Sequence, residues 1–213
     1  MSWTDLLGWV GTALFLARLL PQPLRLRRTG DTSGVSVHSA LNALVSDSGW
    51  LVHGLLTGLA PVWVAAVCSI PIDLYVLWHL RRDIELGHVS GAGLWAAALA
   101  VGGALGGSVG LGIVLGTSVV VNHAPQVWTA WRAHSISGLA PATWWFALAD
   151  AALWGGYGIA ERDAALVAYG VVLAVASVAI LVALAVRPVR LSAAVVAGHA
   201  EPPPPDPHEA PTP

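Results

Sequence analysis

Three acidic residues lie inside long apolar segments of this 213-residue sequence: Asp47, Asp73 and Asp150. A carboxylate at the centre of a membrane-spanning helix costs about 2.5–3.5 kcal/mol, so its default interpretation is functional. Asp150 lies deepest in its segment and could bind a cationic or hydroxylated solute, or titrate as a proton-coupling group. A buried structural hydrogen bond is the alternative. Asp47 is a second proton-coupling candidate, whereas Asp73 could pair with Arg18 or another basic group.

Two further polar residues, Asn122 and His123, lie one helical turn before a Pro-Gln pair. The amide of Asn122 could hydrogen-bond a polar solute, and the imidazole of His123 could shuttle protons. Hydrogen bonds between neighbouring helices are the alternative role for both residues. His53 lies near the end of another apolar segment and is interpreted as an interfacial residue.

The composition indicates a membrane protein. Hydrophobic residues make up 56% of the chain and charged residues only 10%, whereas an ordinary soluble domain carries about 25% charged residues. The net charge of −2 argues against a nucleic-acid partner, and the single cysteine excludes an internal disulfide. We find no nucleophile elbow, phosphate loop or metal-ligand spacing, so we expect neither an enzyme nor a cofactor or metal site.

The apolar pattern predicts an all-α integral membrane fold with seven transmembrane helices, each near the roughly 20 residues needed to cross a bilayer. The fourth and fifth form one apolar stretch, which we divide at a cluster of glycines around Gly107 because glycine weakens a helix. The predicted spans are residues 4–22, 37–57, 60–80, 90–106, 109–131, 139–158 and 163–186.

Arginine residues occur in alternate loops, which sets the predicted orientation. They follow the first, third, fifth and seventh spans, and the other side has only Arg162 beside two acidic residues. The positive-inside rule therefore predicts an outside N-terminus and a cytoplasmic C-terminus in the plasma membrane. Residues 188–213 form a proline-rich tail that we expect to be disordered in the cytoplasm.

The sequence repeats itself at an offset of 104 residues without a gap. This offset aligns two Pro-Gln pairs, two Ser-Gly pairs and Trp50 with Trp154. Three spans reverse the chain, so one extra span is needed before a second parallel copy can begin. The sequence therefore predicts a first three-helix repeat at 1–82, a linker helix at 88–107 and a second repeat at 108–187.

The repeated motifs are Pro21-Gln22 followed by RLRRTGDTSGVS, and Pro125-Gln126 followed by VWTAWRAHSISGLA. Together with the endings Trp50-Leu-Val-His-Gly and Leu-Trp154-Gly-Gly-Tyr-Gly, they resemble the PQ-loop superfamily, and in particular the SWEET and SemiSWEET sugar transporters. The resemblance covers about residues 5–187. It implies a three-plus-one-plus-three fold and alternating access, with prolines as hinges. Residues that fit this hinge role, with the glutamines satisfying freed carbonyls, are Pro21, Gln22, Pro125, Gln126 and Pro141.

The resemblance also implies a solute pocket between the repeats. Trp50 and Trp154 match its paired tryptophans, and Ser46 and Asp150, each four residues earlier, match its small polar positions. The asparagines usual in such pockets are missing, because their positions fall near Ala65/Ala66 and Tyr169/Gly170.

Three functions remain open. The first is a facilitator for neutral sugars, implied by the family resemblance and the paired tryptophans. The second is a proton-coupled carrier of an amino acid or other charged metabolite, which Asp150 and His123 favour. The third is a non-transporting receptor or scaffold. The expected partners are a small-molecule solute and the lipid bilayer, and a second copy of the chain, in a homo-oligomer, is a further candidate.

Overall fold

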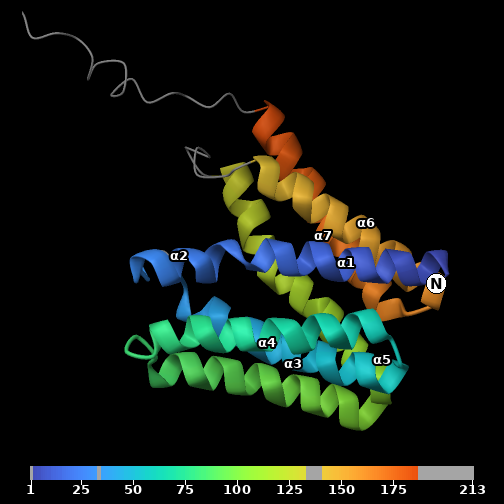
Figure 1. Ribbon diagram of the computed structural model, residues 1–213, viewed down its shortest axis with the longest axis horizontal. Coiled ribbons are helices and arrows are strands. Elements are labelled where there is room, and N and C mark those ends of the chain that lie inside the picture. Colours follow the sequence, from blue (N-terminus) through green and yellow to red (C-terminus); the bar gives the residue numbers. More distant parts are fainter. Residues whose placement is uncertain (1, 33–34, 133–140, 187–213) are drawn as a thin grey trace, which may run out of the picture.

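The computed structural model describes residues 2–32, 35–132 and 141–186, and within these ranges it contains seven α-helices and no strand (Figure 1). The prediction of an all-helical chain is therefore confirmed for the described residues. The helices are α1 (Trp3–Leu19), α2 (Pro21–Thr29), α3 (Val37–Thr57), α4 (Ala60–Leu80), α5 (Leu86–Arg132), α6 (Pro141–Glu161) and α7 (Ala164–Val186).

The beginning of the chain differs from the predicted single span at 4–22. A capping box starts α1, in which the Asp5 amide donates to the Ser2 hydroxyl and the Ser2 amide donates to the Asp5 carboxylate. α1 ends at Leu19 and α2 begins at Pro21, a position where proline loses no helical hydrogen bond, while Leu20 between them keeps helical dihedral angles of φ −62° and ψ −35°. The basic segment after Pro21 is therefore helical until Gly30, whose φ of 63° ends α2.

The predicted fourth and fifth spans are two arms of α5. Gly107 divides them with φ 58° and ψ −141°, a conformation that is essentially restricted to glycine. The arms then fold back on each other (Figure 1), and a Cβ atom on Gly110 would collide with the carbonyl oxygen of Gly102. The glycine cluster thus provides both the turn and the close approach beside it.

Helix packing joins the first part of the chain to the last. Within the first part, α4 packs against α1 and α3, and within the last part, α7 packs against α5 and α6. Two further pairs, α1 with α6 and α3 with α5, connect these groups (Figure 1). Each group therefore contributes helices to one shared interior.

Close contacts recur at positions 104 residues apart. Gly54 packs against the backbone of Trp63, and Gly158 packs in the same way against Val167. Two other glycines lie between a residue from each group of helices. These contacts are Gly8 with Pro61 and Tyr157, and Gly112 with Ala165 and His53.

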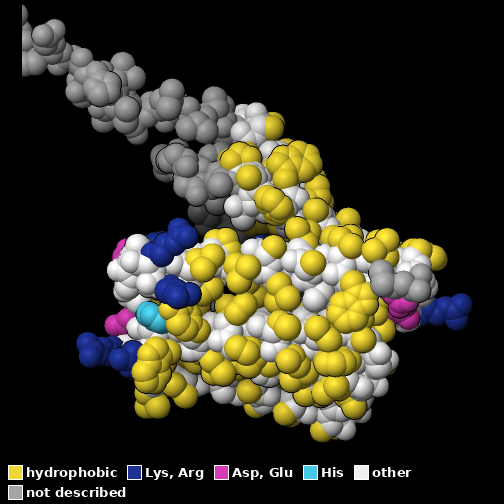
Figure 2. All heavy atoms as spheres, viewed as in Figure 1, with side chains coloured by type: hydrophobic (Ala, Val, Ile, Leu, Met, Phe, Trp, Pro, Cys, Tyr) yellow, Lys and Arg dark blue, Asp and Glu magenta, His cyan; other side chains and the backbone are white. Residues whose placement is uncertain are grey.

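The outer surface is apolar. Large hydrophobic side chains on α5 and α7 are exposed, among them Leu94, Leu105 and Val175, and hydrophobic side chains cover most of the face in Figure 2. Three described segments are long and apolar enough to cross a membrane, namely Ala60–Leu80, Leu86–Ser118 and Ala164–Val186. The chain is therefore a membrane protein, and the remaining predicted spans stay predictions.

Tryptophans near helix ends carry arginines over their rings. The Arg81 guanidinium lies 4.4 Å from the Trp78 ring centroid, and that of Arg132 lies 4.3 Å from the Trp128 ring centroid. Both indoles are largely exposed. Such exposed indole–arginine pairs suit the boundary between hydrocarbon and headgroups.

Candidate functional site

A cavity of about 230 Å³ lies between the two groups of helices. It is lined by side chains of α1, α3, α4, α5, α6 and α7. Aromatic side chains from both groups line it, and charged or titratable side chains also reach it. The polar groups used in the following argument are Arg18, Ser46, Asp47, Asp73, His123 and Tyr169.

The predicted tryptophan pair lies at this cavity. Trp50 and Trp154 line it from α3 and α6, and Trp154 is buried against residues of both groups of helices. Ser46 also lines it and accepts a hydrogen bond from Trp95 Nε1 at 3.1 Å. The positions where asparagines were missing are likewise at the wall, occupied by Ala65, Ala66 and Tyr169.

Asp150 lies behind the cavity wall and is fully buried. The Tyr169 hydroxyl donates to Asp150 Oδ2 at 2.7 Å, and Arg18 Nη1 lies 3.5 Å from the same oxygen. Arg18 and Tyr169, in contrast, both line the cavity. Asp150 therefore holds two cavity-lining side chains in position, and the predicted solute contact of Asp150 stays a prediction.

Arg18 and Tyr169 were not among the predicted site residues. Arg18 comes from the last turn of α1 and is about a third exposed, and its guanidinium also lies 5.7 Å from the Phe15 ring centroid. The signal for Arg18 was an arginine inside an apolar run, and the sequence suggested Asp73 as a candidate partner. Its position beside Asp150 depends on the packing of α1 against α6.

Asp47 and Asp73 line the cavity from α3 and α4. The two carboxyl groups interact with each other, and Asp47 also interacts with Ser69, whose hydroxyl donates to the Ala66 carbonyl at 3.1 Å. Asp73 is 7% exposed, and Asp150 rather than Asp73 forms the ion pair with Arg18. The sequence indicated Asp47 and Asp73 as separate candidates, and the packing of α3 against α4 brings them together.

His123 lines the cavity from α5, and its ring centroid lies 6.4 Å from that of Trp144. The three neighbouring predicted residues Asn122, Pro125 and Gln126 lie within α5, but their side chains are outside the described part of the structure. The structure therefore places one of the two polar candidates of this turn at the cavity.

The predicted hinge residues occupy helix starts in two cases. Pro21 and Pro141 are the first residues of α2 and α6, and Gln22 is exposed beside Pro21. Another proline, Pro71, lies inside α4, two residues before Asp73. A proline there removes one helical hydrogen bond, so Pro71 is a position of local weakness that we did not single out from the sequence.

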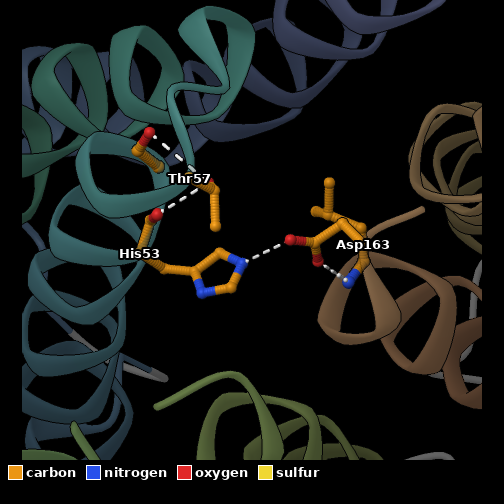
Figure 3. A network of polar contacts seen from close by, with 5 residues as sticks. His53, Thr57 and Asp163 are labelled. Atoms are coloured by element: carbon orange, nitrogen blue, oxygen red, sulfur yellow. Dashed lines mark hydrogen bonds and ion pairs between the residues drawn. The ribbon is translucent and has the colours of Figure 1, made fainter. Parts of the chain in front are cut away.

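His53 and Asp163 form a buried contact between the two groups of helices, shown in Figure 3. His53 Nε2 lies 2.9 Å from Asp163 Oδ2, and the two side chains are 3% and 9% exposed. Asp163 Oδ1 also accepts from the Leu166 amide at the start of α7. The interpretation of His53 as an interfacial residue is therefore wrong, because its ring points into the protein.

The pKa of Asp163 is shifted downward. Burial acts to raise the pKa of this carboxyl, but the hydrogen bonds from His53 and from the Leu166 amide outweigh burial and lower it. Asp163 is therefore held as a carboxylate between α3 and α7.

Two hydrophobic clusters join the two groups of helices, and one of them packs Val45 and Trp50 of α3 against Leu99, Leu111 and Leu115 of α5. Leu59 and Val62 pack with Trp154, Tyr157 and Leu166 in the other shared cluster, near the end where Figure 1 places the N-terminus. Two other clusters belong to separate groups. One contains Leu26, Val76 and Leu80, and the other contains Ala147, Leu173 and Ile180.

The PQ loop repeat family model matches residues 3–63, which contain α1, α2, α3 and the start of α4. No curated protein matches the chain significantly. The family match and the apolar helices support a membrane protein of the PQ-loop class.

Proposed function

We propose that this protein is a membrane transporter that moves a small polar solute by alternating access, with a sugar as the leading substrate class. The observation that carries the proposal is the cavity lined by Trp50 and Trp154, because these tryptophans come from different groups of helices at equivalent positions of the repeat. Flat apolar rings beside polar groups suit a hydroxylated ring, which presents both apolar and polar faces.

Contacts that recur 104 residues apart support this proposal. Glycine contacts recur at the 104-residue offset. The same offset relates α1 to the second arm of α5 and α3 to α6, so the contact of α1 with α6 corresponds to the contact of α3 with α5. Two similar units around one cavity are the arrangement that lets a transporter expose a fixed site to either side by rocking one unit against the other.

The distribution of the hydrophobic clusters suggests which conformational state of the transport cycle the structure represents. The shared cluster around Trp154 and the His53–Asp163 contact close the end that holds the N-terminus, whereas the clusters that contain Leu26 and Ile180 each belong to one group alone. We infer that the cavity opens toward the arginine-rich side, which the positive-inside rule assigns to the cytoplasm of a plasma-membrane protein.

The test is counterflow uptake of labelled glucose in proteoliposomes containing wild type, Trp154→Ala or Trp145→Ala. Trp145 lies on the same helix but is 62% exposed, which makes it a matched control. We expect uptake by wild type and Trp145→Ala, with at least a tenfold loss in Trp154→Ala. Folded wild-type protein without glucose uptake would contradict a glucose facilitator.

A second candidate is a proton-coupled carrier of an amino acid or another charged metabolite. The observation that favours it is the presence of Arg18, Asp47 and Asp73 at the cavity wall, since a neutral solute needs none of these charges. Uptake of labelled amino acids driven by a pH gradient distinguishes this candidate from the sugar facilitator. In either case the expected partners are the solute and the bilayer.

A further inference from the structure

Asp73 is the most unusual polar side chain at the cavity. It comes from the middle of α4, is 7% exposed, and its Oδ2 atom receives no hydrogen bond from a protein donor within the described residues. A buried acceptor without a donor is costly, since it loses its hydrogen bonds to water. It interacts with Asp47, which is itself an acceptor whenever it is ionised.

A proton resolves this conflict. Two carboxylates side by side in a poorly solvated site repel each other, and one bound proton converts that repulsion into a hydrogen bond. The proton then lies on an oxygen of one residue while the other carboxylate accepts from it. The Ser69 hydroxyl donates to the Ala66 carbonyl at 3.1 Å and also interacts with Asp47, so it can stabilise the remaining negative charge by turning its proton to that carboxylate.

The surrounding helices supply little competing positive charge. Among the described residues, the charged or titratable groups that line the same cavity from other helices are Arg18 on α1, His123 on α5 and Tyr169 on α7. Arg18 attracts Asp47, but its ion pair is with Asp150. Arg18 is thus near the acid pair, but its guanidinium is already paired with a third carboxylate, that of Asp150.

The acid pair has no counterpart at the positions 104 residues later. At the 104-residue offset, Asp47 corresponds to Ala151 and Asp73 to Ser177, both of which are buried. The carboxyls are therefore not part of the packing that the two groups of helices share. Since equivalent positions are filled without ionisable groups, the fold itself does not require them.

We propose that Asp47 and Asp73 form one proton-binding site on the cavity wall, which holds a single shared proton at neutral pH. Release of the proton to cavity water leaves two carboxylates. The added negative charge then attracts the Arg18 guanidinium from Asp150 toward Asp47. The proton-coupling role of this site rests on the proposed transport function, whereas proton binding itself does not.

The test is infrared spectroscopy of the full-length protein in lipid, titrated from neutral to alkaline pH. We expect wild type to show the C=O band of a protonated carboxylic acid at neutral pH, shifted in heavy water and lost at alkaline pH. Asp47→Asn and Asp73→Asn should each lose this band. Asp83→Asn, which removes an exposed carboxylate after α4, should retain it.

Two results would overturn the proposal. One is a wild-type protein without a protonated carboxyl at neutral pH, a measurement that needs no variant to fold. The other is a band that persists in both folded Asn variants, which would place the proton elsewhere. Glucose counterflow does not enter this readout, so a failed transport proposal would leave the proton-site result standing.

Discussion

Arg18 is the residue on which the electrostatics of the cavity depend. It faces the cavity, pairs with the buried Asp150 and attracts Asp47, which also lines the cavity. Asp150 needs this cation, because an ionised carboxylate without a partner is very costly in the interior. The link between these residues joins α1 to α6, so charge and packing are coupled at this point.

Replacement of Asp150 should destabilise the protein more than replacement of a surface acid. Asp150→Ala leaves Arg18 and the Tyr169 hydroxyl without their partner. We expect the free energy of unfolding to fall by about 2–3 kcal/mol, below the value for a fully buried pair because Arg18 is about a third exposed. Unfolding in mixed micelles measures this loss, with Asp83→Ala as control. Equal stability of both variants would contradict the role of the ion pair.

Acid should weaken the contact between His53 and Asp163. The pKa of Asp163 is lower in the folded protein than its ordinary value, so the contact stabilises the fold above the unfolded-state pKa of about 4. That stabilisation is lost as the pH falls through the folded-state pKa. Stability measured against pH should therefore drop less steeply below pH of about 4 in Asp163→Asn than in wild type. Parallel curves would show that Asp163 contributes nothing to acid sensitivity.

At the scale of the helices, the sequence predicted some boundaries well. The spans 37–57 and 60–80 coincide with α3 and α4, because Gly58 terminates one apolar run just before the next begins. The helical course of α2 was missed, since a polar arginine-rich segment has no apolar pattern. The pairing of Asp47 with Asp73, and of Asp150 with Arg18, was also missed because these contacts depend on how separate helices pack.

The turn inside α5 gives a test in adjacent glycines. Gly106 is helical, whereas Gly107 has φ 58°. A Cβ atom added at either glycine would have no neighbouring atom within 4 Å. Gly107→Ala should therefore destabilise the protein by about 1–3 kcal/mol through backbone strain alone. Gly106→Ala should be neutral or stabilise by up to about 1 kcal/mol. Thermal unfolding of both variants compares them, and equal effects would argue against a glycine-specific turn.

At the scale of the whole molecule, the two groups of helices meet through small residues. Gly8 and Gly112 each touch one residue from their own group and one from the other. A larger side chain would push the helices apart at both places, although the contacting residues differ. The sequence offset anticipated this correspondence, but it could not show which helices meet across the interior.

Equivalent substitutions in the two groups should have similar consequences. Gly8→Val and Gly112→Val both introduce atoms where a Cβ would already come closer than 3.0 Å to a neighbour. We expect each to lower the free energy of unfolding by about 1–3 kcal/mol. Gly93→Val is the control, since a side chain at Gly93 meets open space. A large effect at one glycine and none at the other would contradict equivalent packing.

The contact between His53 and Asp163 has no twin. The positions related to them by the repeat are Tyr157 and Leu59, which pack together in an apolar cluster. An assembly of two identical three-helix chains would carry each such contact twice, because any substitution would appear in both copies. Joining the copies in one polypeptide frees each to change alone. Gly8 and Gly112 thus keep the same close packing at positions 104 residues apart, while the polar contact of His53 with Asp163 is found in one of the two corresponding places.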